Sequence, residues 1–420
     1  MNVMIINQYA SNKGDRAVLH FLVRELKRNN ISDISISTHD RKWWAGSGIA
    51  SEAGVKFVPW GLNTERPVNS GLLRRKALGI RDRLEPVRYG LGRNILLKFR
   101  KAPGLKRLVC NGEFLRAVNA ADLVVSTGGH HVTTLLSPDA VSGQLFDMGM
   151  VHMAGKPLVL WSQSIGPLEF RRPENAAFVR SVLSEASEIF VRDDHSSELM
   201  EKFGVRCCGV RQTFESVIGL NDFFPSYKNP SDREKILGIA IYAAQARAVA
   251  DHAAYVNDIA ALADHAVQKG YTVRFFPMEL KDGGSDDRPL IREITGRIKD
   301  PARCIVEDRD MDTAQHLAKV AQCRVFAGHK THSVIFALAA GTPLIALAYH
   351  KKTEDFMAQY GLSRYAIADR EISAGRLCNC FDSLNTELDA VGRLEFEKSR
   401  EYGQAVRNDF SDMVKRYVHA

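Results

Sequence analysis

The chain has 420 residues and a formal net charge of +8, and 45% of its residues are hydrophobic and 25% charged. This size predicts two globular domains. No apolar run reaches the roughly 18 residues that crossing a bilayer requires, so we do not expect a membrane-spanning protein. The seven cysteines form neither a disulfide framework nor a zinc pattern, which favours a cytoplasmic location.

The first predicted unit of the chain is a strand, a loop and a helix. Residues 3–7 form an apolar run typical of a strand, and the polar loop QYASNKGD follows them. Apolar residues then recur with a helical period, at Ala17, Leu19, Leu22, Val23 and Leu26. This order of elements is the repeating unit of an α/β fold.

A strongly basic segment follows at residues 71–107. It holds twelve lysine and arginine residues against only Asp82 and Glu85, so it carries +10 while the rest of the chain is close to neutral. Such clustering predicts a localised anionic partner. The segment could form short amphipathic helices that bind an anionic membrane. It could equally be a solvated surface loop. Aromatic residues are sparse, so nucleic acid is not expected.

Three further strands of the first half end in distinctive loops: ADLVVSTGG, KPLVLWSQSIGP and ASEIFVRDDHSS. A polar stretch with prolines near residues 222–235 marks a domain boundary. We therefore predict an N-terminal α/β domain over 1–225, a C-terminal α/β domain over 226–393, and a final helix within 394–420 that packs on the first domain.

The second half repeats the alternation of strands and helices and contains the stretch GHKTHSVIFALAAGTPLIALAYHKK. Residues 323–327 and 344–349 are predicted strands, and residues 332–340 are a helix between them. Because loops after parallel strands open on one edge of a sheet, the basic side chains after each strand should face one crevice. These side chains are His329, Lys330 and His332, then His350, Lys351 and Lys352.

His332 is predicted in the first turn of its helix, where unpaired N–H groups and the helix dipole attract anions. The expected ligand is a small phosphorylated or carboxylated molecule. His329 and His332 also have the spacing of a metal pair, but no cysteine or carboxylate lies nearby in the sequence, so we expect no metal. Neither G-x-G-x-x-G after the first strand nor a P-loop motif is present, which disfavours a dinucleotide oxidoreductase or a P-loop enzyme.

These motifs, in this order, resemble those of the polysaccharide pyruvyl transferase family. The segments GGSDDRPL around Asp286–Arg288 and DPAR at Asp300–Arg303 resemble its colanic-acid branch in particular. The loop SNKGDRAVL, the segments STGGHH, SQSIGPLE and FVRDDHS, and the C-terminal stretch all resemble family motifs. The matching C-terminal residues are Lys330, His332, Ser333, Thr342, Pro343, Tyr349 and Lys352. Two departures are Lys330, where the family usually has arginine, and the region of Thr213, where it typically has aspartate.

The resemblance implies two tandem doubly wound αβα domains of the glycosyltransferase B architecture, with the active site in the cleft between them. It implies transfer of pyruvate from phosphoenolpyruvate onto two sugar hydroxyls, without a cofactor. His332 would be the catalytic proton donor. The donor would be bound by Arg192, Lys352, Lys330 and Ser333. The loops facing the acceptor or the cleft would contain Asn12, Gly14, Asp15, Gly128, Gly129, His130, Gln163 and Gly166.

Several alternatives stay open at this point. His131, His329 and His350 are rival histidines for the acid role. The chain could instead be a nucleotide-sugar-dependent glycosyltransferase of the same architecture, or a non-catalytic protein that binds an anionic glycan. A lipid-linked acceptor would suit contact of the basic segment with the inner face of the plasma membrane.

Overall fold

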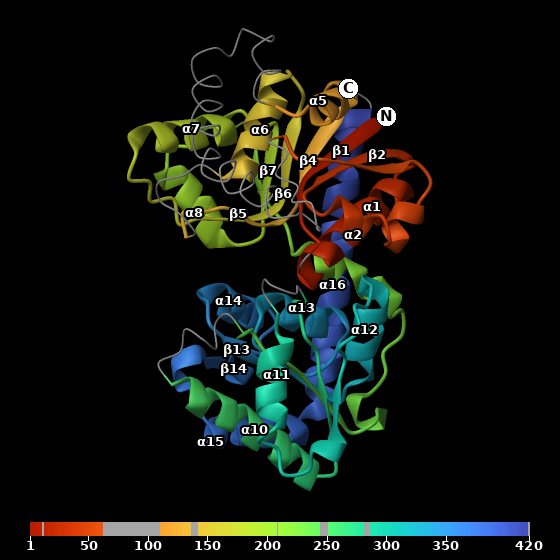
Figure 1. The fold of residues 1–420 in the computed structure, drawn as a ribbon, viewed down its shortest axis with the longest axis vertical. Helices are drawn as coiled ribbons and strands as arrows, with labels where there is room; N and C mark the ends of the chain where they lie inside the picture. Colours follow the sequence, from red (N-terminus) through yellow and green to blue (C-terminus); the bar gives the residue numbers. More distant parts are fainter. Residues whose placement is uncertain are drawn as a thin grey trace, which may run out of the picture. The chain divides into compact units, whose positions relative to one another are not determined.

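The computed structural model describes residues 1–10, 12–61, 110–135, 142–207, 209–243, 251–280 and 286–418. The chain forms two compact units. The N-terminal unit comprises Met1–Ala10, Val18–Phe214 and Asn408–Ala420, and the C-terminal unit comprises Ser11–Ala17 and Glu215–Arg407. Each unit combines a parallel sheet with helices (Figure 1). The basic segment of residues 71–107 lies outside the described residues.

The N-terminal unit is built on an eight-stranded sheet of order β3-β2-β1-β4-β6-β7-β8, with β5 paired to β6. Every pairing in it is parallel. Its strands are β1 (Asn2–Gln8), β2 (Asp33–Thr38), β3 (Val55–Val58), β4 (Leu123–Ser126), β5 (Gly129–Val132), β6 (Leu158–Ile165), β7 (Glu188–Val191) and β8 (Val210–Gln212). Its first helix, α1 (Lys13–Arg28), buries the apolar residues Leu19, Leu22 and Leu26, as their spacing predicts.

The other helices found in the described residues of this unit lie between its later strands. They are α2 (Arg41–Trp44), α5 (Gly112–Ala120), α6 (Gly143–Met153), α7 (Pro173–Ser184) and α8 (Asp194–Lys202). The Asp193 carboxylate accepts the amide of Ser196 at 2.8 Å and so caps the start of α8. Aspartate is a favoured N-cap because its oxygen satisfies an amide that has no partner within the helix.

The C-terminal unit is built on a six-stranded parallel sheet of order β11-β10-β9-β12-β13-β14. Its strands are β9 (Ile236–Ala240), β10 (Thr272–Phe275), β11 (Cys304–Val306), β12 (Val325–Gly328), β13 (Leu344–Ala348) and β14 (Ala366–Ala368). Its helices are α10 (His252–Gln268), α11 (Arg288–Thr295), α12 (Thr313–Gln322), α13 (Thr331–Ala339), α14 (Lys351–Gln359), α15 (Ala374–Thr386) and α16 (Leu388–Val418). Short 3-10 segments lie at Gly48–Ser51, Ser216–Phe223, Pro230–Asp232, Pro301–Arg303, Ser363–Tyr365 and Asp369–Glu371.

The long helix α16 begins at Leu388, ahead of the predicted start at residue 394. Leu388 and Val391 are buried, so the apolar face of this helix extends further toward its N-terminus than predicted. The last residues of α16 belong to the N-terminal unit. There the ring of Phe410 lies 5.7 Å from Phe21 and 4.8 Å from Trp161. None of the helices in the described ranges combines the length and apolarity needed to span a membrane.

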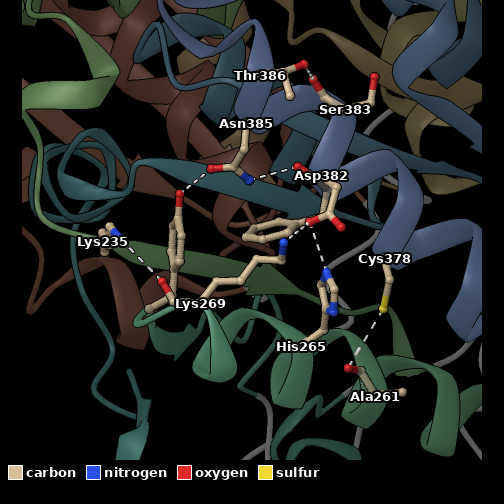
Figure 2. Close-up of polar contacts among 11 residues, drawn as sticks. Lys235, Ala261, His265, Lys269, Cys378, Asp382, Ser383, Asn385 and Thr386 are labelled. Carbon is tan, nitrogen blue, oxygen red and sulfur yellow. Dashed lines mark hydrogen bonds and ion pairs between the residues drawn. The ribbon is translucent and has the colours of Figure 1, made fainter.

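Helices α10 and α15 are joined by a set of polar contacts (Figure 2). The carboxylate of Asp382 accepts a hydrogen bond from His265 Nε2 at 2.9 Å and pairs with Lys269 Nζ at 3.0 Å. The hydroxyl of Tyr271 donates to the side-chain carbonyl of Asn385. These contacts hold α15 beside α10 and the residues that follow it.

Candidate active site

The predicted basic side chains gather at the carboxyl edge of the C-terminal sheet. Strands β12 and β13 are parallel neighbours, as Phe326 pairs with Leu344, so the loops after them meet as predicted. The hydroxyl oxygens of Thr331 and Thr353, from the first turns of the helices that follow these loops, lie 3.0 Å apart. The structure therefore confirms that these two sequence segments share one edge of a sheet.

His332 is the second residue of α13, and its ring is packed against Gly14 of the SNKGD loop. A Cβ atom added to Gly14 would lie 2.7 Å from Cβ of His332 and would overlap the imidazole. The loop is held by the Asn12 side chain, which accepts the amide of Gly14 at 2.8 Å, and by a bridge between Asn12 and Glu279. Asp15 follows in the first turn of α1. The first and last family-like motifs of the chain thus meet within one unit.

Lys330 and Ser333 have partners inside the protein. The Lys330 side chain is buried, its ammonium pairs with the carboxylate of Glu279, and it lies 4.8 Å above the ring of Tyr242. The Ser333 hydroxyl donates to the Lys330 carbonyl at 2.6 Å. In this structure Lys330 is charge-balanced and Ser333 supports the first turn of α13.

Asp287 organises the loops after β9 and β10. Its buried carboxylate accepts the amides of Ala243 at 3.1 Å, Met278 at 3.0 Å and Glu279 at 2.9 Å. Burial raises the pKa of Asp287 above its usual value despite these hydrogen bonds. The sequence singled out this region only as part of a family-like motif, and the role of Asp287 in fixing Glu279 was missed.

His329 is fully buried, so it is not a solvated loop residue. Its Nδ1 lies 2.8 Å from the hydroxyl of Tyr255, and its Nε2 lies 3.2 Å from Asp369. Within the described parts of the chain, no group of three histidine, cysteine or acidic residues is arranged to hold a metal ion. His329 is therefore engaged by a tyrosine and an aspartate that the sequence did not single out.

A cavity of about 810 Å³ opens beside this group, at the carboxyl ends of β13 and β14. Its lining includes Tyr255, Tyr349, His350, Lys351, Asp369 and Arg370. Burial, and then the neighbouring charge of Lys352, lowers the pKa of His350 below its usual value, which favours the neutral imidazole. Lys352 itself is the second residue of α14. The mixture of hydroxyl, cationic and carboxylate groups suits a polar ligand.

Arg192 follows β7 in the N-terminal unit and is only 3% exposed. Its Nε donates to the Ser164 hydroxyl at 2.9 Å, and that hydroxyl donates to Asp193 at 2.7 Å. Asp193 is in turn the cap of α8. The guanidinium is therefore held in place at the carboxyl ends of β6 and β7, through a serine and an aspartate.

The glycine-containing loops of the N-terminal unit also assemble at this edge of their sheet. The Gln163 amide donates to the Thr127 carbonyl, and the His130 ring forms a hydrogen bond with the Gly166 carbonyl. Gly128 lies so close to β6 that an added Cβ would be 3.0 Å from the Ser162 carbonyl oxygen. Gly129 and Gly166 have φ angles of +149° and +103°, which favour glycine.

The predicted site residues thus form two groups, one in each unit. Thr213, one of the two departures from the family pattern, donates to Asp409 of α16 at 2.6 Å. A carboxylate is therefore present beside this position, supplied by a distant part of the sequence. The spacing of the motifs gave no signal for this contact, because its two residues are 196 positions apart.

Comparison with known proteins gives both a fold and a family. The chain is similar to the UDP-GlcNAc 2-epimerase from Neisseria meningitidis (TM-score 0.59, 11% identity, 100% of this chain and 99% of that one). It is also similar to UGT89C1 from Arabidopsis thaliana (TM-score 0.54, 10% identity, 99% of each chain). At these identities the likeness concerns the fold alone, and it confirms the predicted glycosyltransferase B type.

Sequence comparison finds the amylovoran biosynthesis protein AmsJ of Erwinia amylovora, which is 22% identical over 428 residues and covers 95% of each chain. The family model for polysaccharide pyruvyl transferase matches residues 12–351. This match begins in the SNKGD loop and runs through His332 to the start of α14, so it contains the motifs that the structure assembles in each unit. The chain belongs to the polysaccharide pyruvyl transferase family.

Proposed function

We propose that this protein transfers pyruvate from phosphoenolpyruvate onto two hydroxyls of a sugar in a cell-surface polysaccharide, forming a ketal and releasing phosphate. The observation that carries the proposal is the position of His332, in the first turn of α13 and against the N-terminal turn of α1. The family and the amylovoran relative support a transferase that acts in polysaccharide synthesis.

The reaction needs an acid at the methylene carbon of the enol phosphate. His332 gives this carbon a proton, which makes it a methyl group and leaves an oxocarbenium-like centre beside it. One sugar hydroxyl adds to that centre and the second displaces phosphate, so the carbon ends with two bonds to sugar oxygens. Of the two hydroxyl protons, one balances the proton given to carbon and the other leaves with phosphate. Imidazole suits the acid role because its ordinary pKa is about 6.5.

The donor is a small polyanion, and cations stabilise the charge that develops on its phosphate. Arg192 can bind a carboxylate or phosphate with two parallel hydrogen bonds, and Lys352 adds a point charge. The helix dipoles of α1 and α13 favour an anion at their N-termini. The loops that hold Gly128, His130 and Gln163 would face the sugar. No cofactor takes part in this scheme.

The acceptor in this proposal is a sugar of an exopolysaccharide or other cell-surface glycan, or its lipid-linked precursor, and a lipid-linked precursor would place the enzyme at the inner face of the plasma membrane. The basic segment of residues 71–107, which lies outside the described residues, would bring the enzyme to anionic lipid. Co-sedimentation with anionic vesicles but not neutral ones, reversed by high salt, checks this part. Equal indifference to both kinds of vesicle contradicts it.

The test of the chemistry is phosphate release from phosphoenolpyruvate with a polysaccharide precursor as acceptor, measured for the wild type and for His332→Gln. Glutamine can donate a hydrogen bond, but its side-chain amide cannot give up a proton near neutral pH. We expect near-complete loss of turnover with donor binding largely retained. Substantial turnover in the variant refutes the acid role. Stabilisation by a UDP-sugar and not by phosphoenolpyruvate would favour a glycosyltransferase.

A further inference from the structure

Lys13 lies in the SNKGD segment, at the start of α1, and was not among the residues that the family motifs single out. Its side chain is only 3% exposed. Its ammonium nitrogen makes no hydrogen bond to any residue that the structure describes. A buried ammonium carries three donors and a full charge, so leaving it without a partner is costly.

Three carboxylates interact electrostatically with the Lys13 ammonium, and each of them has another partner. They are Asp310, Asp287 and Glu307. Asp310 pairs with Arg16, and Asp287 accepts three backbone amides. Glu307 lies 3.2 Å from Lys319 and 3.4 Å from Arg274. The residues around Lys13 therefore do not form a dedicated ion pair with it.

The neighbourhood of Lys13 also fits a small anion. Lys13 is the first residue of α1. The next residue, Gly14, contacts His332 in the first turn of α13. The N-termini of α1 and α13, each with a favourable dipole, therefore lie close to each other at Gly14.

The electrostatics of this region agree with an unbalanced cation. Burial lowers the pKa of Lys13 to about 8, although Asp310 acts in the opposite direction. Burial, then Lys13 and Arg16, hold the pKa of the nearby His316 well below its usual range. His316 is therefore neutral, and the Lys13 ammonium has three carboxylates in its neighbourhood but no hydrogen-bond partner among the described residues.

We propose that Lys13 binds the phosphate group of the donor beside His332, and is a donor-binding residue in addition to those of the family motifs. This inference rests on the proposed function for the identity of the donor. The flexible four-carbon stem lets the ammonium turn toward the phosphate. The charge of Lys330 is already neutralised by Glu279. Lys13 therefore supplies the positive charge that binds the phosphate.

The test compares thermal unfolding of the full chain with inorganic phosphate, phosphoenolpyruvate or pyruvate, for the wild type, Lys13→Met and Lys13→Arg. Without ligand, we expect Lys13→Met to melt higher than the wild type by roughly 3–6 °C, because it removes an unpaired buried charge. We expect its affinity for phosphate and for phosphoenolpyruvate to fall by about 10–100-fold. Lys269→Met, which removes a lysine paired with Asp382 in the same unit (Figure 2), is the control and should bind both ligands normally.

A pH series separates a binding role from a structural one. In the wild type, affinity for phosphate should fall above about pH 8 as the free ammonium loses its proton. Lys13→Arg stays charged, so this fall should disappear in that variant. Equal affinity of wild type and Lys13→Met, or stabilisation by pyruvate but not phosphate, overturns the inference. Binding of phosphate but not phosphoenolpyruvate would support an anion site at Lys13 and refute phosphoenolpyruvate as the donor. Binding of neither would refute both.

Discussion

At the scale of single residues, the contact between Gly14 and His332 leaves no space for a methyl group. We predict that Gly14→Ala displaces the imidazole and lowers turnover by about 10–100-fold, because small displacements of a reacting group are costly. The free energy of unfolding should change much less than the rate. Phosphate release and thermal unfolding, measured on the same preparation, check both parts.

Gly375→Ala is the matched control for this substitution. Gly375 lies in α15 of the same unit, and a Cβ added there meets no atom within 4 Å. Because alanine favours a helix over glycine, this variant should be slightly more stable and fully active. Turnover that falls equally in both variants, or in neither, contradicts the idea that Gly14 is required for the position of His332.

Lys13 also makes stability depend on pH, with a direction that can be worked out. Its pKa falls from 10.5 in the unfolded chain to about 8 in the folded one. Below pH 8 both states hold the proton, and the folded state bears the full cost of the buried charge. Between pH 8 and 10.5 only the unfolded state keeps the proton, so the stability of the folded state rises with pH.

Burial of the charged Lys13 ammonium should lower the free energy of unfolding by on the order of 3 kcal/mol at pH 7. Lys13→Met should therefore be more stable than the wild type at pH 7, and the difference in unfolding free energy should shrink toward pH 10. Denaturant unfolding at the two pH values measures it. A difference that is constant with pH would show that Lys13 is not desolvated as the structure has it.

At the scale of elements, α12 begins with a capping box formed by Asp312 and Gln315. The Asp312 carboxylate accepts the amide of Gln315 at 2.8 Å, and the Gln315 side chain accepts the amide of Asp312 at 3.2 Å. Asp312→Ala should lower the free energy of unfolding by about 1 kcal/mol. Asp300→Ala is the control, because Asp300 precedes a 3-10 turn without a side-chain cap and should change stability little. Equal losses in both variants would contradict the capping argument.

The sequence predicted elements better than it predicted partners. The helix expected at residues 332–340 is observed at Thr331–Ala339, and the strand expected at 323–327 is observed at Val325–Gly328. These elements were predictable because the period of their apolar residues, and the glycine at position 341 that ends the helix, are local features of the sequence. The pairing of Lys330 with Glu279 joins residues 51 positions apart. No local pattern encodes such a contact, so the burial of Lys330 and of His329 could not be foreseen.

At the scale of the whole molecule, the alternation of strands and helices was enough to predict two parallel α/β units. It was not enough to assign every residue to its unit. Residues 11–17 follow the first strand, yet they belong to the C-terminal unit, where Gly14 meets His332. In the same way α16 starts in the C-terminal unit and ends in the N-terminal one. Both assignments depend on tertiary contacts that periodicity does not specify.

The stability of each unit can be measured separately because the tryptophans lie in only one of them. All four tryptophans, Trp43, Trp44, Trp60 and Trp161, belong to the N-terminal unit, so their fluorescence reports that unit alone. Phe410 of α16 is fully buried against Phe21 and Trp161. Phe410→Ala should therefore cost about 3–5 kcal/mol in this unit and lower the midpoint of the fluorescence transition.

Phe381→Ala is the matched substitution in the C-terminal unit, where Phe381 is equally buried and packs on Tyr271 at 5.2 Å. Since that unit contains no tryptophan, we expect this variant to lower the far-UV circular dichroism transition and to leave the fluorescence midpoint almost unchanged. Both probes should be followed through one urea titration for each variant. If Phe381→Ala shifts the fluorescence midpoint as far as Phe410→Ala does, the two units unfold in one cooperative transition. That result would contradict the prediction that they unfold independently.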